Sequence, residues 1–180
     1  MSRLTVVVPV RNEREAIPSL FTRFKEYSSQ LPPGWSLLLV DGMSTDGTPE
    51  VAEEWSDRLP VRVIRLSENR GLGGALEAGL LEAIPESDVI VTMDGDDSHD
   101  PSTIGAMLEN IDDGADLVIA SRFEPGGEEI GVAGHRKVLS HAASGLLRTL
   151  FPVGAAKDYS SGFRAYRSDA LRAVADAHGR

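Results

Sequence analysis

Cysteine is absent from the sequence, and this absence removes several kinds of chemistry at once. Without cysteine there is no disulfide framework, no thiolate nucleophile and no cysteine-bound zinc. Long apolar runs are also absent, because no stretch approaches the roughly 18 residues that a membrane-spanning helix needs. Only residues 1–3 precede the first strand-like run, which leaves no room for a signal peptide. We therefore expect a cytoplasmic protein.

Basic residues are few relative to acidic ones. Lys and Arg together number 18 and Asp and Glu 28, so the formal net charge is −10. This balance argues against nucleic-acid binding through a basic surface and against unaided docking on anionic lipid. The remaining composition, 41% hydrophobic and 26% charged, is that of an ordinary globular protein. At this length we expect one domain over residues 1–180.

Strand and helix signals alternate along the chain without a long linker or a repeat. Apolar runs predict strands at 4–10, 36–40, 61–66, 89–93 and 117–121. Helical spacing predicts helices at 16–27, 48–55, 73–84, 101–111, 136–150 and 168–177. Apolar strands that alternate with helices indicate an α/β fold, a mostly parallel doubly wound sheet with helices on both faces. Residues 124–134 and 158–167 are less regular. Because no strand follows the last helix, we expect the domain to lack its C-terminal part.

The most informative stretch is residues 88–101, in which a short apolar run ends abruptly in Asp94-Gly95-Asp96. A buried strand would deliver these two carboxylates to the sheet edge where open α/β sheets bind ligands. Mg²⁺ and Mn²⁺ prefer carboxylate oxygens, and Gly95 lets the backbone approach a neighbour closely. A solvated acidic turn is the alternative. The strand in front and the helix start at Pro101 favour a metal–phosphate site.

Polar clusters follow the first three predicted strands as well, at 9–13, 41–48 and 69–74. Each cluster alone could be turn chemistry, and Asp46 and Thr48 could cap the helix at 48–55. Four clusters at one sheet edge favour a ligand site. Gly71, Gly73 and Gly74 do not form a Walker loop, which needs a lysine after the last glycine, and a dinucleotide fingerprint follows the first strand rather than the third. We interpret these glycines as allowing close packing of the third helix.

Six motifs occur in order along the chain. They are Pro9-x-Arg11-Asn12-Glu13, Val40-Asp41-x-x-Ser44-x-Asp46-Gly47-Thr48, Asn69-x-Gly71-x-Gly73-Gly74, Met93-Asp94-Gly95-Asp96-x-Ser98-His99-x-Pro101, Ser121-Arg122-Phe123 and Ser161-Gly162-Phe163-Arg164-x-Tyr166-Arg167. Together they resemble the inverting GT-A-type glycosyltransferases of family 2, in particular the dolichol-phosphate (polyprenyl-phosphate) mannosyltransferase branch. The resemblance covers nearly the whole chain and implies a GT-A, Rossmann-like fold.

The resemblance also implies a nucleotide-sugar site. The residues that would line it are Pro9, Arg11, Glu13, Val40, Asp41, Asp94, Gly95, Asp96 and Arg122. Asp41 would accept hydrogen bonds from a uracil or guanine base, so GDP-mannose and UDP-glucose are both candidate donors. Asp94 and Asp96 would be the DXD pair, and Asp96 would bind Mg²⁺ or Mn²⁺ with Ser98 near the metal.

Four residues would carry the catalytic roles, namely Asp94, Asp96, Arg122 and Arg136. The two arginines would neutralise donor or acceptor phosphates, which suits a guanidinium fork, although either could instead form a surface salt bridge. The chain departs from the family where Gly42 and Met43 replace an Asp and a Gly, and where Arg11 replaces a Tyr. The family's later arginine-containing loop would lie beyond Arg180.

The prediction of the acceptor substrate rests on the absence of a residue pair that could act as a general base. Transfer to a sugar hydroxyl needs a general base, yet the segment before Arg167 offers Asp158 without a paired carboxylate. A phosphate acceptor is already anionic and needs cations instead, which Arg122, Arg136, Lys137 and Arg164 could supply. We therefore predict a polyprenyl or dolichyl phosphate acceptor, contact at the cytoplasmic face of a membrane, and a β-linked product.

Other functions remain alternatives to this prediction. A glycosyltransferase acting on a sugar hydroxyl and a non-catalytic nucleotide-sugar-binding module both fit the fold. A sugar-1-phosphate nucleotidyltransferase would carry a Gly-rich basic loop after the first strand, which residues 9–13 do not provide. A phospho-accepting receiver would need an acidic pair after the first strand and a lone Asp after the third, and the sequence lacks this pattern.

Overall fold

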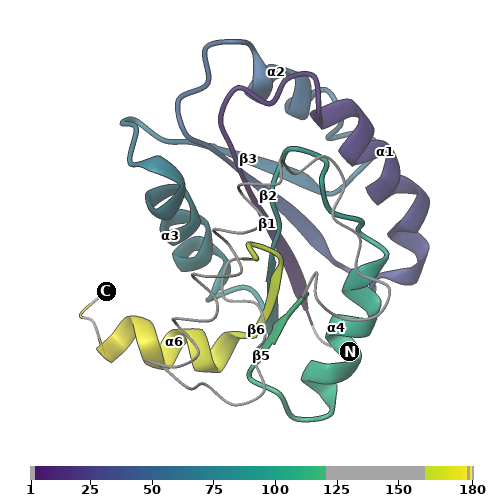
Figure 1. The fold of residues 1–180 in the computed structure, drawn as a ribbon, viewed down its shortest axis with the longest axis vertical. Helices are drawn as coiled ribbons and strands as arrows, with labels where there is room; N and C mark the ends of the chain where they lie inside the picture. Colours follow the sequence, from purple (N-terminus) through teal and green to yellow (C-terminus); the bar gives the residue numbers. More distant parts are fainter. Residues whose placement is uncertain (1–2, 121–160, 178, 180) are drawn as a thin grey trace, which may run out of the picture.

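Strand β1 (Leu4–Val10) lies inside a six-stranded sheet whose order is β3-β2-β1-β4-β6-β5. The computed structural model describes residues 3–120, 161–177 and 179 (Figure 1). The other strands are β2 (Ser36–Asp41), β3 (Val61–Arg65), β4 (Val89–Thr92), β5 (Leu117–Ile119) and β6 (Arg164–Arg167). The helices are α1 (Ile17–Tyr27), η1 (Ser28–Gln30), α2 (Thr48–Glu53), α3 (Gly71–Ala83), α4 (Thr103–Asp112) and α6 (Ser168–Ala177). These bounds confirm the predicted elements within the described residues to within a few positions.

Helices cover both faces of the sheet, as the sequence predicts. Along β1, Val6, Val8 and Val10 point toward one hydrophobic cluster, whereas Val7 points toward the other. The first cluster includes α1 and α4, and the second includes α3 and Leu171 of α6. Figure 1 shows the same division, with α1, α2 and α4 on one side of the sheet and α3 and α6 on the other. Since successive side chains of a strand point to opposite faces, an unbroken apolar strand needs both layers.

Close packing of α3 depends on a glycine that the sequence pattern did not single out. A Cβ at Gly79 would lie 2.4 Å from Val7 Cγ1 and 2.9 Å from Val40 Cγ2, so α3 can approach the sheet only without a side chain there. A Cβ at Gly71 or Gly73 would meet nothing within 4 Å. The interpretation of Gly71 and Gly73 as packing glycines was therefore wrong. Gly71 instead opens the helix with a φ of +67°.

The C-terminal part of the chain contributes a strand to the sheet that the sequence pattern did not predict. Strand β6 runs antiparallel between β4 and β5, pairing Val91 with Ala165 on one side and Val118 with Ala165 on the other. The β1 pairs with β2 and β4, and the β2 pair with β3, are parallel. The sheet is thus mostly parallel, as predicted, with one inserted antiparallel strand. Among the described residues, no helix is long and apolar enough to span a membrane.

Candidate active site

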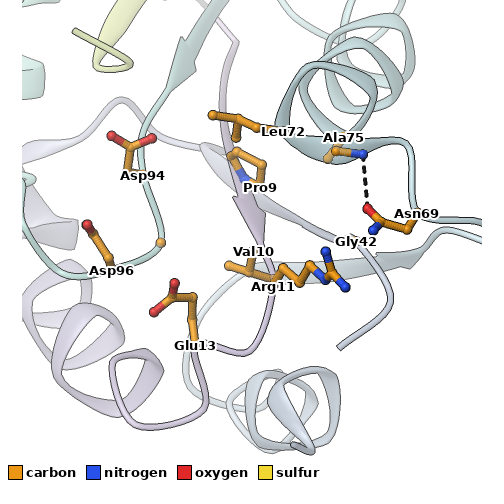
Figure 2. Close-up of a pocket in the computed structure, with 12 residues that line it drawn as sticks. Pro9, Val10, Arg11, Glu13, Gly42, Asn69, Leu72, Ala75, Asp94 and Asp96 are labelled. Atoms are coloured by element: carbon orange, nitrogen blue, oxygen red, sulfur yellow. Dashed lines mark hydrogen bonds between the residues drawn. The ribbon is translucent and has the colours of Figure 1, made fainter. Parts of the chain in front are cut away.

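A cavity of about 340 Å³ opens at the carboxyl ends of β1, β2 and β4 (Figure 2). The residues that line it are Pro9, Val10, Arg11, Glu13, Gly42, Asn69, Gly71, Leu72, Ala75, Asp94, Gly95 and Asp96. They come from all four polar clusters of the sequence, which confirms that these clusters meet at one edge of the sheet. Ligands of open α/β sheets bind in this position.

One end of the cavity is acidic. Asp94 and Asp96 follow β4, and Glu13 follows the neighbouring strand β1 and lies near Asp96 (Figure 2). Burial of Glu13 and the negative charge of Asp96, with a smaller effect from Asp46, raise the pKa of the Glu13 carboxyl above its ordinary value. Glu13 and Asp96 therefore repel each other, and a cation beside them would relieve that repulsion. We call Glu13, Asp94 and Asp96 the acidic end.

Gly95 brings the acidic turn close to β1. A Cβ at this position would lie 2.4 Å from Val10 Cγ1 and 3.3 Å from the Pro9 carbonyl oxygen. The glycine thus permits a close approach between two backbone segments of the protein, and this approach places Asp94 and Asp96 beside the end of β1. A larger residue here would displace the acidic turn from Glu13.

Asp94 is contacted from two directions. His99 Nε2 lies 3.1 Å from Asp94 Oδ2, and the His99 ring packs against Phe163 with centroids 5.1 Å apart. Gly162 faces the same carboxylate, since a Cβ on Gly162 would lie 2.8 Å from Asp94 Oδ1. Both neighbours belong to the sequence motifs, but the sequence assigns neither a role. The contact between Gly162 and Asp94 joins residues far apart in the chain and leaves no local signal.

The residues after Asp94 hold the turn in shape. The Ser98 backbone N–H donates to Asp96 Oδ1 at 3.0 Å, and Ser98 does not line the cavity. Asp97 has a φ of +63°, in the left-handed region, and its side chain forms an ion pair with Arg23 of α1. Helix α1 therefore anchors the turn that carries Asp96.

The loops after β1 and β2 are joined by a set of hydrogen bonds. The Asn12 N–H donates to Ser44 Oγ at 2.8 Å, and the Thr45 N–H donates to Asn12 Oδ1 at 2.8 Å. The Glu13 N–H donates to Thr48 Oγ1 at 2.9 Å, which fixes the backbone of an acidic-end residue. This junction gives Ser44, Thr45 and Thr48 a structural role in joining the two loops.

Asp46 has a local structural role at the start of α2, which the sequence left open as an alternative to ligand binding. Its Oδ1 accepts hydrogen bonds from the Thr48 N–H at 3.0 Å and from the Thr48 hydroxyl at 2.6 Å. Burial alone would raise the pKa of Asp46, but hydrogen bonds from Thr48 and Arg14 outweigh it and lower the pKa below its ordinary value. Asp46 and Thr48 thus stabilise the start of α2.

The other end of the cavity is less charged. It is lined by Arg11, Gly42, Asn69, Leu72 and Ala75 (Figure 2). Asn69 Oδ1 accepts a hydrogen bond from the Gly71 N–H at 3.0 Å, at the start of α3. Leu72 is 61% exposed and presents an apolar surface at the rim. The cavity therefore combines an acidic end with a polar and apolar end.

The remaining predicted site residues lie elsewhere. Val40 is fully buried in the core beside α3, and Asp41 is 3% exposed with both carboxylate oxygens accepting from the Ser44 N–H. Neither lines the cavity, where Gly42 takes the adjacent position.

Arg164 lies in β6 and its Nε donates to the Ser161 carbonyl oxygen. The predicted residues that lie outside the described residues are Arg122, Arg136, Lys137 and Asp158, with the predicted helix at 136–150.

The chemistry of the acidic end suits a cation that a ligand helps to bind. In the part of the chain that the structure describes, no lysine or arginine forms an ion pair with Glu13, Asp94 or Asp96. Over the same residues, no three acidic or histidine side chains converge closely enough to hold a metal by themselves. Mg²⁺ sites of this kind take one or two carboxylates from the protein and the remaining ligands from water and phosphate.

Comparison with known proteins gives a consistent result. The family model for glycosyl transferase family 2 matches residues 5–175. The dolichol-phosphate mannosyltransferase of Pyrococcus furiosus is 36% identical over 96% of this chain and 48% of the relative. The undecaprenyl-phosphate mannosyltransferase of Micrococcus luteus is 36% identical over 96% of this chain and 69% of the relative. The chain thus spans about half to two thirds of the length of these relatives.

Solved structures share the fold. Glucosyl-3-phosphoglycerate synthase from Mycobacterium tuberculosis, solved with Mn²⁺, UDP and phosphoglyceric acid, matches with a TM-score of 0.71 and 25% identity over 94% of this chain and 57% of that chain. The mannosyltransferase PcManGT from Pyrobaculum calidifontis, solved with GDP-Man and Mn²⁺, matches with a TM-score of 0.67 and 22% identity over 96% and 46%. The predicted GT-A fold is confirmed.

Proposed function

Because the chain belongs to glycosyl transferase family 2, we propose that it transfers a hexose from a nucleotide-sugar to a polyprenyl or dolichyl phosphate. The observation that carries this proposal is the acidic end of the cavity, where Glu13, Asp94 and Asp96 meet at the carboxyl edge of the sheet. The names of the relatives support a lipid-phosphate acceptor and mannose as the sugar. GDP-mannose and UDP-glucose are both candidate donors.

The donor would occupy the cavity along its length. Its diphosphate would lie at the acidic end, and its nucleoside would lie toward Arg11, Gly42 and Asn69. We retain Asp41 as a candidate for base recognition through its neighbour Gly42, and Pro9 as part of the wall. Arg122 and Arg136 stay candidates for neutralising phosphate, on the resemblance alone.

The acidic end would hold Mg²⁺ or Mn²⁺ through Asp96, with Asp94 beside it. The bound cation would supply positive charge that stabilises the diphosphate leaving group. The raised pKa of Glu13 is consistent with this assignment, since it arises from burial and, next, from the negative charge of Asp96. The carboxylates of this chain would otherwise repel the donor phosphates, so donor and cation should bind together. PcManGT, solved with GDP-Man and Mn²⁺, offers a precedent for this combination of donor and cation in a protein of the same fold.

The reaction that follows needs no general base. An oxygen of the acceptor phosphate would attack C1 of the sugar as the bond from C1 to the diphosphate breaks. The products would be a lipid-phosphate sugar with inverted configuration and a nucleoside diphosphate. The acceptor phosphate is already anionic near neutral pH, so no proton has to be removed before attack. A lipid acceptor would bring the protein to a membrane surface, and we propose the cytoplasmic face.

Transfer can be tested directly with labelled donors. The protein is incubated with GDP-mannose or UDP-glucose, Mn²⁺, and either a polyprenyl phosphate in detergent or a panel of free sugars. We expect labelled lipid in the organic phase, and none when EDTA replaces Mn²⁺. Transfer to free sugars without transfer to lipid phosphate would instead support the sugar-hydroxyl alternative. Donor binding without any transfer would support the non-catalytic alternative.

A further inference from the structure

We propose that His99 is a positioning residue that holds the Asp94 carboxylate in the orientation used for donor binding. This inference rests on the proposed function, because it concerns how that site is built. His99 does not line the cavity, whereas Asp94 does. His99 would therefore act through Asp94 rather than on the donor itself.

The first argument is the hydrogen bond between the two side chains. His99 Nε2 lies 3.1 Å from Asp94 Oδ2. An ionised carboxylate can only accept, so Nε2 must carry the hydrogen when this contact forms. The His99 side chain is 16% exposed and that of Asp94 is 39% exposed, so the imidazole contacts the carboxylate from the protein side. This arrangement resembles the outer partners that orient ligating groups in metal sites.

The second argument is that the imidazole is itself held in place. Its ring packs against Phe163 at an interplanar angle of 43°, with centroids 5.1 Å apart. Phe163 is 2% exposed and belongs to the larger hydrophobic cluster. A ring fixed by the core can direct Nε2 at one point. The hydrogen bond to Asp94 therefore has a rigid donor.

The third argument is the space kept free on another side of Asp94. A Cβ at Gly162 would lie 2.8 Å from Asp94 Oδ1 and 3.1 Å from Oδ2. The Gly162 carbonyl oxygen accepts a hydrogen bond from Thr92 Oγ1 at 2.7 Å, which ties this backbone to the end of β4. The carboxylate thus lies between the His99 imidazole and the Gly162 backbone, where a side chain at position 162 would crowd it.

The test compares nucleotide binding by matched variants. Calorimetry measures the affinity of GDP and UDP, each with Mn²⁺, for the unmodified protein, His99→Ala, His99→Phe and His99→Gln. We expect His99→Ala and His99→Phe to weaken binding by roughly 10- to 100-fold. His99→Phe keeps a ring against Phe163 but has no donor, so it separates packing from hydrogen bonding. His99→Gln can place an amide N–H near the former Nε2 position and should recover most of the affinity.

A double-mutant cycle shows whether His99 acts through Asp94. In an Asp94→Asn background, His99→Ala should cause little further loss, because the hydrogen-bonded pair has already been changed. An equal loss in both backgrounds would overturn the proposal, as would unchanged affinity in His99→Ala. Failure of His99→Gln to recover binding, with a melting temperature lowered as in His99→Ala, would also overturn it, because it would indicate a structural role.

A measurement without ligand separates this proposal from the proposed function. The ¹⁵N spectrum of the His99 ring should change on Asp94→Asn, since the acceptor of the Nε2 hydrogen is altered. An unchanged ring spectrum would contradict the proposal regardless of nucleotide binding. If the unmodified protein binds neither nucleotide while the ring spectrum responds to Asp94→Asn, the proposed function fails and the pairing of His99 with Asp94 stands.

Discussion

Four acidic side chains lie at or beside the acidic end, and each meets a different neighbour. Asp94 contacts His99, Asp96 accepts from the Ser98 N–H, and Asp97 pairs with Arg23. Glu13 instead faces the charge of Asp96. In the described part of the chain, only Asp97 of these four has a guanidinium partner. The uncompensated charge is therefore concentrated on residues that line the cavity.

Replacement of Asp96 should separate binding from folding. We expect Asp96→Ala to weaken Mn²⁺-dependent binding of a nucleoside diphosphate by roughly 10- to 100-fold, the effect of losing a contact with a charged group. Its melting temperature should stay close to that of the unmodified protein, because Asp96 is exposed and lies outside the core. Asp113→Ala, an exposed position at the end of α4, is the control. Equal calorimetric affinity with and without Mn²⁺ in the unmodified protein would contradict the metal assignment.

Glu13 should show a conflict between stability and binding. A carboxyl whose pKa is raised by folding binds its proton more tightly in the folded state, so this group favours folding more as the pH falls through its folded pKa. Glu13→Gln removes the charge at neutral pH. It should therefore raise the melting temperature of the metal-free protein by on the order of 1–2 °C while weakening metal-dependent nucleotide binding. Calorimetric scans in EDTA check the first effect, and a lower melting temperature would count against the electrostatic account.

At the scale of elements, α3 offers two glycines with opposite expectations. Gly79 lies against Val7 and Val40, whereas a Cβ at Gly73 would meet nothing within 4 Å. We expect Gly79→Ala to lower the free energy of unfolding by about 1–3 kcal/mol through overpacking. Gly73→Ala should raise it by up to about 1 kcal/mol, because alanine favours helix. Urea unfolding followed by circular dichroism measures both, and effects of the same sign would contradict the packing described for α3.

The elements that sequence reasoning could predict are those with strong local signals. The apolar run of β1 and the spacing of Ile17, Leu20 and Phe24 in α1 identify themselves without the rest of the chain. Strand β6 does not, because its four residues include Arg164 and Arg167 and it exists through pairing with β4 and β5. Gly79 was also missed, because its importance lies in the facing strands.

The residues of the candidate site also fall into those that the sequence could predict and those that it could not. Asp94, Asp96 and Glu13 could be predicted to lie near one another because each comes within a few residues of the carboxyl end of a parallel strand. The roles of His99 and Gly162 could not, because they depend on the distance of each from Asp94. The local role of Asp46 was open from the sequence and became clear only from its hydrogen bonds with Thr48 and Arg14.

At the scale of the whole molecule, the net charge of −10 bears on membrane contact. Anionic lipid attracts clusters of basic residues, and an excess of acidic residues opposes that attraction. We expect the protein to cosediment no better with vesicles that contain anionic phospholipid than with neutral vesicles at low salt. Any recruitment should depend on the polyprenyl phosphate acceptor. Salt-sensitive binding to anionic vesicles without that acceptor would contradict this expectation.

The insertion of β6 between β4 and β5 also sets an order of events during synthesis. Strands β1 to β4 emerge from the ribosome well before Arg164, and among the strands that the structure describes β5 pairs only with β6. At about 5–20 residues per second, several seconds separate the synthesis of β4 from that of β6, the strand that pairs with its outer edge. An unpaired strand edge can pair with another chain, so we expect the nascent protein to be most prone to aggregation in this interval. Gly162 arrives with β6, and the surroundings of Asp94 are therefore completed only after most of the described residues have been made.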